Sequence, residues 1–440
     1  MGGGAFLQAA APGEPTLNIS RLSATVYARL KDVYLEKLEK YFATHEVHCP
    51  IAAPEKADHG DVDIIASREG TVDFLHLANA VGASAIIQHS LSKCTLGVPK
   101  DGSSSSKPAV AYTHCYAHGK DQPSSTTTEE GFAQVDIELV PPHLFEWSAF
   151  HASYGDMGSM IGYMVHHLGF TIANTGLRLR MKELEDSKDS DLHNFADRDG
   201  RIELSHQPDE IMRFLGLSVD RYQAGFKTLD ELYAWLGECR MLSLDVIKLK
   251  RDNSHERARE QKRPIFSRFL NEWLPKHMGS ARDHPSNTTT EPDHEGVEPP
   301  DLDVQREQYL REALDVFHKR PDYERVHSAL VRTIANDTAA NLLKPIIARH
   351  SQKQSKHLTE ILRAFRRWVD VGEDGKPFTL ATQQSDTESE LHRLLASDGR
   401  SLRDEAAVGE WVREHWEEVR GLERHRVKTQ SCVCRSEVIP

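Results

Sequence analysis

Two short runs of the sequence place acidic residues at alternate positions among aliphatic ones. The first, DVDIIAS, contains Asp61 and Asp63, and the second, FAQVDIELV, contains Asp136 and Glu138. Successive side chains on a β-strand point to opposite faces, so each run predicts a strand with two carboxylates on one face and aliphatic residues on the other. If the two strands are neighbours, three or four carboxylates meet at one place on a sheet.

A group of carboxylates at this spacing predicts a bound cation. Two unit charges about 4 Å apart repel by roughly 4 kcal/mol at an effective dielectric constant near 20, and a cation between them removes that cost. Ligands that are all oxygen favour Mg²⁺ or Mn²⁺ over Zn²⁺, and Mg²⁺ commonly joins carboxylates to substrate phosphates. The pattern therefore favours phosphoryl or nucleotidyl chemistry. The alternative is a pair of exposed strands whose acids face only solvent.

The two runs together resemble the DNA polymerase β-like nucleotidyltransferase superfamily, in which a DxD strand is followed by a later strand with a third acid. The likeness covers about residues 47–140 and extends, through GDMGSMIGYMVHHLGFTIANTGLRLRM, to about Leu242. That longer stretch is similar to uncharacterised nucleotidyltransferase-like proteins of filamentous fungi. The resemblance implies a metal-dependent enzyme that moves a nucleoside monophosphate from an NTP to a hydroxyl of RNA, protein or a small molecule.

The same resemblance implies a role for each acid. Asp61 and Asp63 would bind two Mg²⁺ or Mn²⁺ ions. Asp136 would hold the catalytic metal and help to deprotonate the acceptor hydroxyl, with Glu138 as the substitute candidate. The nucleotide and its metal ions are the cofactors and partners that follow from this assignment.

One departure from the family pattern concerns the phosphates. The family has Gly-Ser or Gly-Gly about a dozen residues before the DxD, where backbone amides at a helix start hold the nucleotide phosphates. Cys49 and Pro50 stand there in this chain. Proline has no amide donor, and cysteine carries a side chain where close backbone approach is needed. A catalytically inactive binding or scaffold protein is therefore the alternative function.

The elements around the acids indicate an α+β fold with a mixed sheet flanked by helices. An amphipathic helix is expected from Leu22 to Phe42, capped by Ser20, because its apolar residues recur at helical spacing. The other helices expected in the first part of the chain lie at 72–81, 155–168, 208–215 and 229–242. The other strands are expected at 85–89 and 110–114, in FTIAN and GLRLRM around an Asn-Thr-Gly turn, and in IELS.

Composition divides the chain into regions. Residues 280–303 are rich in Pro, Thr and acids without apolar periodicity, which predicts a disordered linker. The pattern beyond it is helical, with helices expected at 304–317, 323–334, 343–347, 358–369 and 408–419. We therefore expect a flexible N-terminus (1–19), a nucleotidyltransferase-like core (20–182), an α/β extension (183–279), the linker (280–303), an all-helical C-terminal domain (304–425) and a tail (426–440).

The overall composition indicates the cellular compartment and excludes some classes of partner. Six scattered cysteines form no CxxC pair, which favours a reducing compartment, either cytoplasm or nucleus. No apolar run approaches the ~20 residues of a membrane span, and Phe6 stands where a myristoylation signal has Ser or Thr. The formal net charge of −13 argues against a protein coated in nucleic acid. We therefore expect an intracellular protein without a membrane partner.

Two further patterns could indicate nucleic-acid binding or zinc binding, but each is better explained by ordinary structure. The basic stretch 344–368 could guide a nucleic-acid backbone, although a solvated helix face that balances acidic neighbours is the favoured interpretation. The runs HEVHC and HCYAH contain potential zinc ligands at His45, His48, Cys49, His114, Cys115 and His118. Neither run has the paired spacing of a structural zinc site, so ordinary histidines are expected there.

Overall fold

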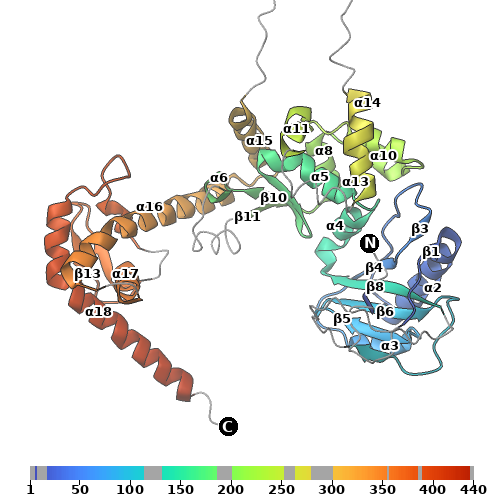
Figure 1. Ribbon diagram of the computed structural model, residues 1–440, viewed down its shortest axis with the longest axis horizontal. Helices are drawn as coiled ribbons and strands as arrows, with labels where there is room; N and C mark the ends of the chain where they lie inside the picture. The colour runs from blue at the N-terminus through green and yellow to red at the C-terminus, as the bar shows by residue number, and fades with distance from the viewer. Residues whose placement is uncertain are drawn as a thin grey trace, which may run out of the picture. The chain divides into compact units, whose positions relative to one another are not determined.

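The computed structural model describes residues 5–6, 17–112, 131–185, 201–251, 263–278, 301–353, 356–384 and 389–436. Within them, the chain forms two compact units, Met1–Arg180 with Glu203–His318, and Met181–Ile202 with Lys319–Pro440. The first unit holds the main sheet, and the second is largely helical (Figure 1). The predicted α+β class is confirmed.

The main sheet has six strands, β2 (Val47–His48), β4 (Val62–Ser67), β5 (Ala85–Gln88), β6 (Lys93–Pro99), β7 (Val110–Tyr112) and β8 (Phe132–Val140). Their order across the sheet is β2-β4-β8-β6-β5-β7. Strands β4 and β8 run parallel, as do β5 and β7, while the other neighbours run antiparallel. The sheet is therefore mixed, as expected, and the two acidic strands are direct neighbours in it.

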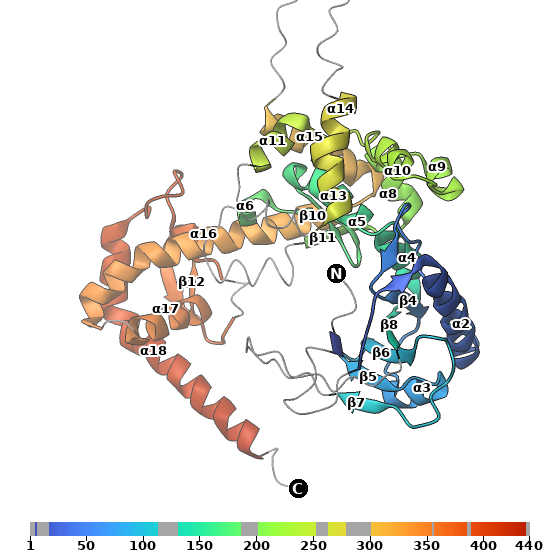
Figure 2. The same cartoon turned by 45° about the vertical axis from the view of Figure 1, so that its right-hand side comes forward.

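Two helices, α2 (Ala24–Phe42) and α3 (Phe74–Ala80), cover one face of this sheet (Figures 1 and 2). The buried residues of α2 recur every four positions, at Leu30, Tyr34, Leu38 and Phe42. They form one stripe on the helix because residues four apart share a face. This stripe packs on the aliphatic side chains of the sheet and forms the main core of the unit. The Asp63 and Asp136 side chains lie on the opposite face of the sheet.

The start of α2 differs from the expectation. Ser23 is the N-cap, since its hydroxyl accepts the Val26 N–H, and Leu22–Ser23 form strand β1. Ser20 is not the cap, because its backbone N–H donates to the Phe132 carbonyl and its hydroxyl accepts from Lys100 Nζ at 2.8 Å. Strand β1 pairs with β3 (Asp58–His59), which brings the beginning of α2 beside the segment that leads into β4.

Directly after β8 the chain turns helical. The 3-10 turn η1 (Pro142–Leu144) leads into α4 (Phe145–Ala152), and α4 lies next to β4 (Figure 1). Helix α5 (Met157–Val165) and the 3-10 turn η2 (His166–Leu168) end at Gly169, whose φ of 84° is the left-handed conformation predicted for that cap. The Asn-Thr-Gly hairpin is also confirmed, with β9 (Phe170–Ala173) antiparallel to β10 (Gly176–Arg180).

The remaining elements of the first unit are mainly short helices. Strand β11 (Arg201–Ser205) joins β9 and β10 in a three-stranded sheet. Helix α8 begins with Pro208 at its first turn, as predicted. The predicted helix 229–242 is shorter, because α10 ends at Leu236. The helices that complete the set are α8 (Pro208–Leu215), α9 (Val219–Ala224), α10 (Leu229–Leu236), α11 (Leu244–Arg251), α13 (Pro264–Arg268), η3 (Phe269–Trp273), α14 (Leu274–Met278) and α15 (Leu302–Val316).

The second unit is built on three long helices, α16 (Arg320–Ser351), α17 (Lys356–Trp368) and α18 (Glu405–Ser436). Helix α16 is continuous through Pro345, so the two helices expected there are one; the buried Leu343, Ile346 and Ile347 hold the chain helical across the proline. The C-terminal region is helical as predicted, with a small addition that the sequence did not indicate. That addition is the antiparallel pair of strands β12 (Val369–Val371) and β13 (Pro377–Thr379), with the 3-10 turn η5 (Leu391–Leu394). The second unit also includes the short helix α6 (Lys182–Glu185).

Buried charges in the second unit are paired. The Glu423 carboxylate is 3% exposed and accepts hydrogen bonds from Trp368, Arg426 and Arg367. Hydrogen bonds from Arg424 and Arg420 lower the pKa of Glu360 to about 2. These pairs fasten α17 to α18.

Most of the predicted linker, residues 280–300, lies outside the described residues. The predicted domain limits therefore stay predictions. In the part of the chain that is described, no helix combines the length and the low polarity that a bilayer crossing requires.

Candidate active site

The two acidic strands place their carboxylates side by side. In the parallel pairing of β4 and β8, Asp63 lies directly opposite Asp136. Paired residues on neighbouring strands point to the same face of the sheet. Asp61 lies near both carboxylates, because its charge acts on Asp63 and the charge of Asp136 acts on Asp61. Asp61 lies just outside β4, which begins at Val62, so it is carried by the end of the incoming loop. The structure therefore brings the three predicted site residues to one place.

Apolar clusters lie on both sides of the acids on this face of the sheet. On one side of them, Ile65 and Val140 pack against Phe145 at the start of α4. On the other side, Phe6 is fully buried against Ala85 and Ile87 of strand β5. By the strand pairing, the carboxylates form a polar strip between these two apolar clusters.

The carboxylates are hard to ionise together. Desolvation, followed by the charges of Asp61 and Asp136, raises the pKa of Asp63 to about 7. The Asp63 side chain is in contact with solvent, yet the surrounding protein removes part of its hydration. Burial also raises the pKa of Asp61 and of Asp136. A site whose acids resist ionisation in the absence of a counter-charge is one that a divalent cation would stabilise.

The arrangement suits Mg²⁺ or Mn²⁺ better than a metal with an all-protein cage. Within the described residues, no group of three or more His, Cys, Asp or Glu side chains is arranged so that it could hold a metal ion by itself, and this includes Asp61, Asp63 and Asp136. Mg²⁺ typically uses one or two carboxylates and completes its octahedral shell with water and substrate phosphates. Asp61, Asp63 and Asp136 supply only oxygen donors, which fits that mode of binding. They could contribute ligands to such an ion, together with water and a substrate.

Asp136 is held by neighbours that the sequence did not single out. Thr95 Oγ1 donates to Asp136 Oδ1 at 2.7 Å, and Gln134 Nε2 donates to the same oxygen at 3.0 Å. These hydrogen bonds oppose the effect of burial on the pKa of Asp136. No local sequence signal marks Thr95, because its position opposite Asp136 depends on the pairing of β6 with β8.

Glu138 is engaged elsewhere. It lies opposite Lys93 on β6, and the two side chains form an ion pair at 3.6 Å. Glu138 shares the face of Asp136 but is directly opposite Ile65, beyond Asp63, in the pairing of β4 with β8. Asp136 is therefore the better placed third acid.

The segment at the family's Gly-Ser position has no helix start. Residues 49–57, all described, follow β2 as an irregular loop with a turn at Pro54 and Glu55. The Cys49 thiol is buried and contacts the Tyr27 hydroxyl at 3.6 Å. The Ile51 N–H donates to Ser153 Oγ at 3.1 Å, so this amide is already used within the protein. A backbone cradle for phosphates of the usual kind is absent from this loop.

The same loop carries an exposed cation near the acids. Lys56 acts electrostatically on Asp61 and Asp63, where its charge opposes the pKa increase caused by burial. No ion pair of Lys56 is found among the described residues. A second cation, Arg263, lies with its Nε 3.9 Å from Asp156 Oδ1, and its Nη1 is buried without a hydrogen-bond partner. Lys56 also acts on Asp156, so both cations face the same carboxylate.

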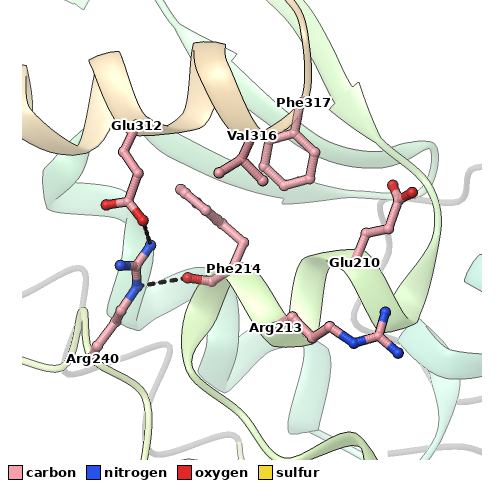
Figure 3. Close-up of a pocket in the computed structure, with 7 residues that line it drawn as sticks. All are labelled: Glu210, Arg213, Phe214, Arg240, Glu312, Val316 and Phe317. Atoms are coloured by element: carbon pink, nitrogen blue, oxygen red, sulfur yellow. Dashed lines mark hydrogen bonds and ion pairs between the residues drawn. The ribbon is translucent and has the colours of Figure 1, made fainter.

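A cavity of about 400 Å³ lies away from the acids, between α8 and α15 (Figure 3). Its aromatic wall is formed by Phe214 and Phe317. Arg240 points toward Glu312, with which it pairs at 2.6 Å, and it also donates to the Phe214 carbonyl (Figure 3). The charge of Arg240 is thus already compensated, and none of the predicted site residues reaches this cavity.

Among the described residues, the other sequence patterns show no second metal centre. His114, Cys115 and His118 lie outside the described residues. In the basic stretch, Arg366 pairs with Asp337 at 2.6 Å and Arg367 pairs with Glu423 at 3.0 Å, so two of its cations are neutralised within the protein.

No model of a known protein family matches the chain, and no curated protein matches it at a significant level.

Proposed function

We propose that this protein is a metal-dependent nucleotidyltransferase of the DNA polymerase β type, which transfers a nucleoside monophosphate from an NTP to a hydroxyl. The observation that carries the proposal is the direct pairing of Asp63 with Asp136 on parallel strands, with Asp61 beside them. The mixed sheet with helices on one face and the acids on the other supports it further. The resemblance of the two acidic strands to that superfamily points the same way.

In the proposed reaction, the acceptor hydroxyl attacks the α-phosphorus of the NTP. The new O–P bond forms as the bond to pyrophosphate breaks, and Asp136 takes the hydroxyl proton. Two divalent ions, when bound, would stabilise the attacking and leaving oxygens. Asp61 and Asp63 would hold these ions, whose positive charge would offset that of the phosphates.

Lys56 and Arg263 are proposed to take over the task of the missing Gly-Ser loop. Cationic side chains can bind phosphates as well as backbone amides can, and Lys acts as a point charge for them. Lys56 acts on the metal-binding acids, and Arg263 has a buried donor without a partner. A Cβ added at Gly155 would lie 3.5 Å from Ala53, so the loop that carries Lys56 packs against the start of α5.

A non-catalytic binding or scaffold protein is the second candidate. It is favoured by the loop at Cys49 and Pro50, in which no helix begins and the Ile51 amide is already bonded. The intact Asp61, Asp63 and Asp136 favour the enzyme. The acceptor class, whether RNA, protein or small molecule, is not distinguished by these residues.

Metal binding provides the first test. Mg²⁺ or Mn²⁺ should raise the melting temperature, because a ligand that binds only the folded state stabilises it by mass action and neutralises the clustered acids. The Asp61→Asn, Asp63→Asn double variant should lose this response. The Asp58→Asn variant, which changes an acid paired with Arg21 outside the strip, is the matched control and should keep it. An unchanged response in the double variant would remove these acids from the site.

A further inference from the structure

Asp136 uses only one of its two carboxylate oxygens within the protein. Oδ1 accepts from both Thr95 Oγ1 and Gln134 Nε2, which occupies its two lone pairs. Oδ2 has no hydrogen-bond partner among the described residues. The carboxylate is thus fixed by one oxygen and open at the other.

The Thr95 hydroxyl is itself fixed from behind. It is 1% exposed, and it gives its single hydrogen to Asp136. His89 Nε2 lies 2.8 Å from the same Thr95 oxygen. Since the Thr95 hydrogen is already used, His89 must be the donor of this second hydrogen bond, which requires the tautomer protonated at Nε2. His89, Thr95 and Asp136 therefore form a chain of hydrogen bonds with one direction.

The strand turn between β5 and β6 sets the position of His89. Its backbone N–H donates to the Lys93 carbonyl at 2.9 Å, where the two strands meet. Thr95 lies on β6 directly opposite Asp136 of β8. The chain of hydrogen bonds therefore starts at an exposed turn and ends at the carboxylate, along two neighbouring strands.

We propose that Thr95 and His89 are positioning residues, which hold Asp136 so that Oδ2 alone is presented to the metal and to the acceptor hydroxyl. This inference rests on the proposed function, because it assigns a metal to Asp136. Groups that orient a metal ligand from behind typically change metal affinity or activity by about 10- to 100-fold when they are lost. Neither residue touches the substrate itself.

The test compares Thr95→Val, which keeps the shape of the side chain and removes the hydroxyl, with Thr95→Ser, which keeps the hydroxyl. Mn²⁺ affinity is measured by calorimetry, and kcat and KM for NMP transfer are measured on the full chain. Thr95→Val should weaken Mn²⁺ binding and lower kcat by about 10- to 100-fold, with little change in the KM for NTP, since Lys56, Asp61 and Asp63 remain. Thr95→Ser should stay within a few-fold of wild type.

Two further variants protect the test against misfolding. Thr171→Val, on strand β9, controls for the loss of a strand hydroxyl elsewhere. His89→Ala changes an exposed side chain and should fold, and it should shift both quantities in the direction of Thr95→Val by a smaller factor.

Three outcomes decide the inference. Wild-type Mn²⁺ affinity and kcat in folded Thr95→Val overturn it and leave the proposed function intact. If Thr95→Val does not fold, wild-type values in His89→Ala overturn it in the same way. A wild-type protein that binds no Mn²⁺ overturns the proposed function, and this inference with it.

Discussion

Asp63 and Asp136 are paired residues on neighbouring parallel strands and lie on the same face of the sheet. They are 73 positions apart in the chain, by the difference of their numbers, so the fold brings them together. Desolvation and the neighbouring carboxylates raise the pKa of Asp63 to about 7.

Removing the charge of Asp63 should stabilise the metal-free protein at high pH. Its pKa is about 7 in the folded state and about 3.9 in an unfolded chain, so the folded state binds the extra proton and stability falls as pH rises from about 4 to 7. In EDTA, Asp63→Asn should therefore melt above wild type at pH 8 and with it near pH 4. Asp58→Asn should show no such gain, because pairing with Arg21 lowers the pKa of Asp58. A lower melting temperature for Asp63→Asn at pH 8 would contradict this.

The chain segment at Phe6 should depend on the absence of a side chain at Gly97. A Cβ added there would lie 2.3 Å from Leu17 Cδ1 and 3.2 Å from Phe6 Cζ. We expect Gly97→Ala to lower stability by about 1–3 kcal/mol in urea titrations, the usual cost of overpacking. Gly131→Ala is the matched control, since its Cβ would meet nothing nearer than 3.6 Å. Equal effects of the two substitutions would show that the packing around Gly97 is not tight.

Lys56→Ala should weaken NTP binding more than it slows the chemical step. Lys56 is exposed, acts electrostatically on Asp61 and Asp63, and has no ion pair among the described residues. Loss of a charged hydrogen-bonding group that holds the phosphates costs about 1.5–3 kcal/mol, which is roughly a 10- to 150-fold rise in the Kd for NTP. Lys107→Ala, another exposed lysine, should leave the Kd unchanged. Fluorescence titration with a labelled NTP measures both, and equal Kd values would exclude Lys56 from the phosphate site.

The sequence was sufficient to predict the two acidic strands, because the alternation of acids and aliphatic residues is local and matches the period of a strand. It did not predict β6, in which Gly97 and Pro99 obscure the strand pattern. In the folded protein, the space that Gly97 leaves admits Leu17 and Phe6, a requirement that no local window contains. The glycine at position 97 is therefore required by tertiary contacts, and the local pattern of a single sequence contains no information about them.

The candidate site shows the same limit. The spacing of Asp61, Asp63 and Asp136 predicted that they lie together, whereas no pattern singled out Thr95 and His89, because their hydrogen bonds depend on strand pairing. The N-cap of α2 was predicted at Ser20 and lies at Ser23, since the pairing of Ser20 with Phe132 and Lys100 takes it out of the helix. In each case, the missing information is a contact between distant parts of the chain.

The central claim, that the three acids catalyse nucleotidyl transfer, is tested most directly at Asp136. Removing this acid should cost several kcal/mol of transition-state stabilisation, which corresponds to orders of magnitude in rate, while some metal and NTP binding persists through Asp61 and Asp63. Glu138→Gln is the control, since Glu138 is on the same strand face and paired with Lys93.

The measurement is transfer of label from α-labelled NTPs, with release of pyrophosphate, to a panel of RNA, protein and small-molecule acceptors in Mg²⁺ or Mn²⁺. We predict transfer by wild type and by Glu138→Gln, and none by Asp136→Asn. A wild-type rate in Asp136→Asn would contradict the assignment of the third acid. No transfer by the wild type from any NTP to any acceptor would contradict the enzyme and favour the binding protein.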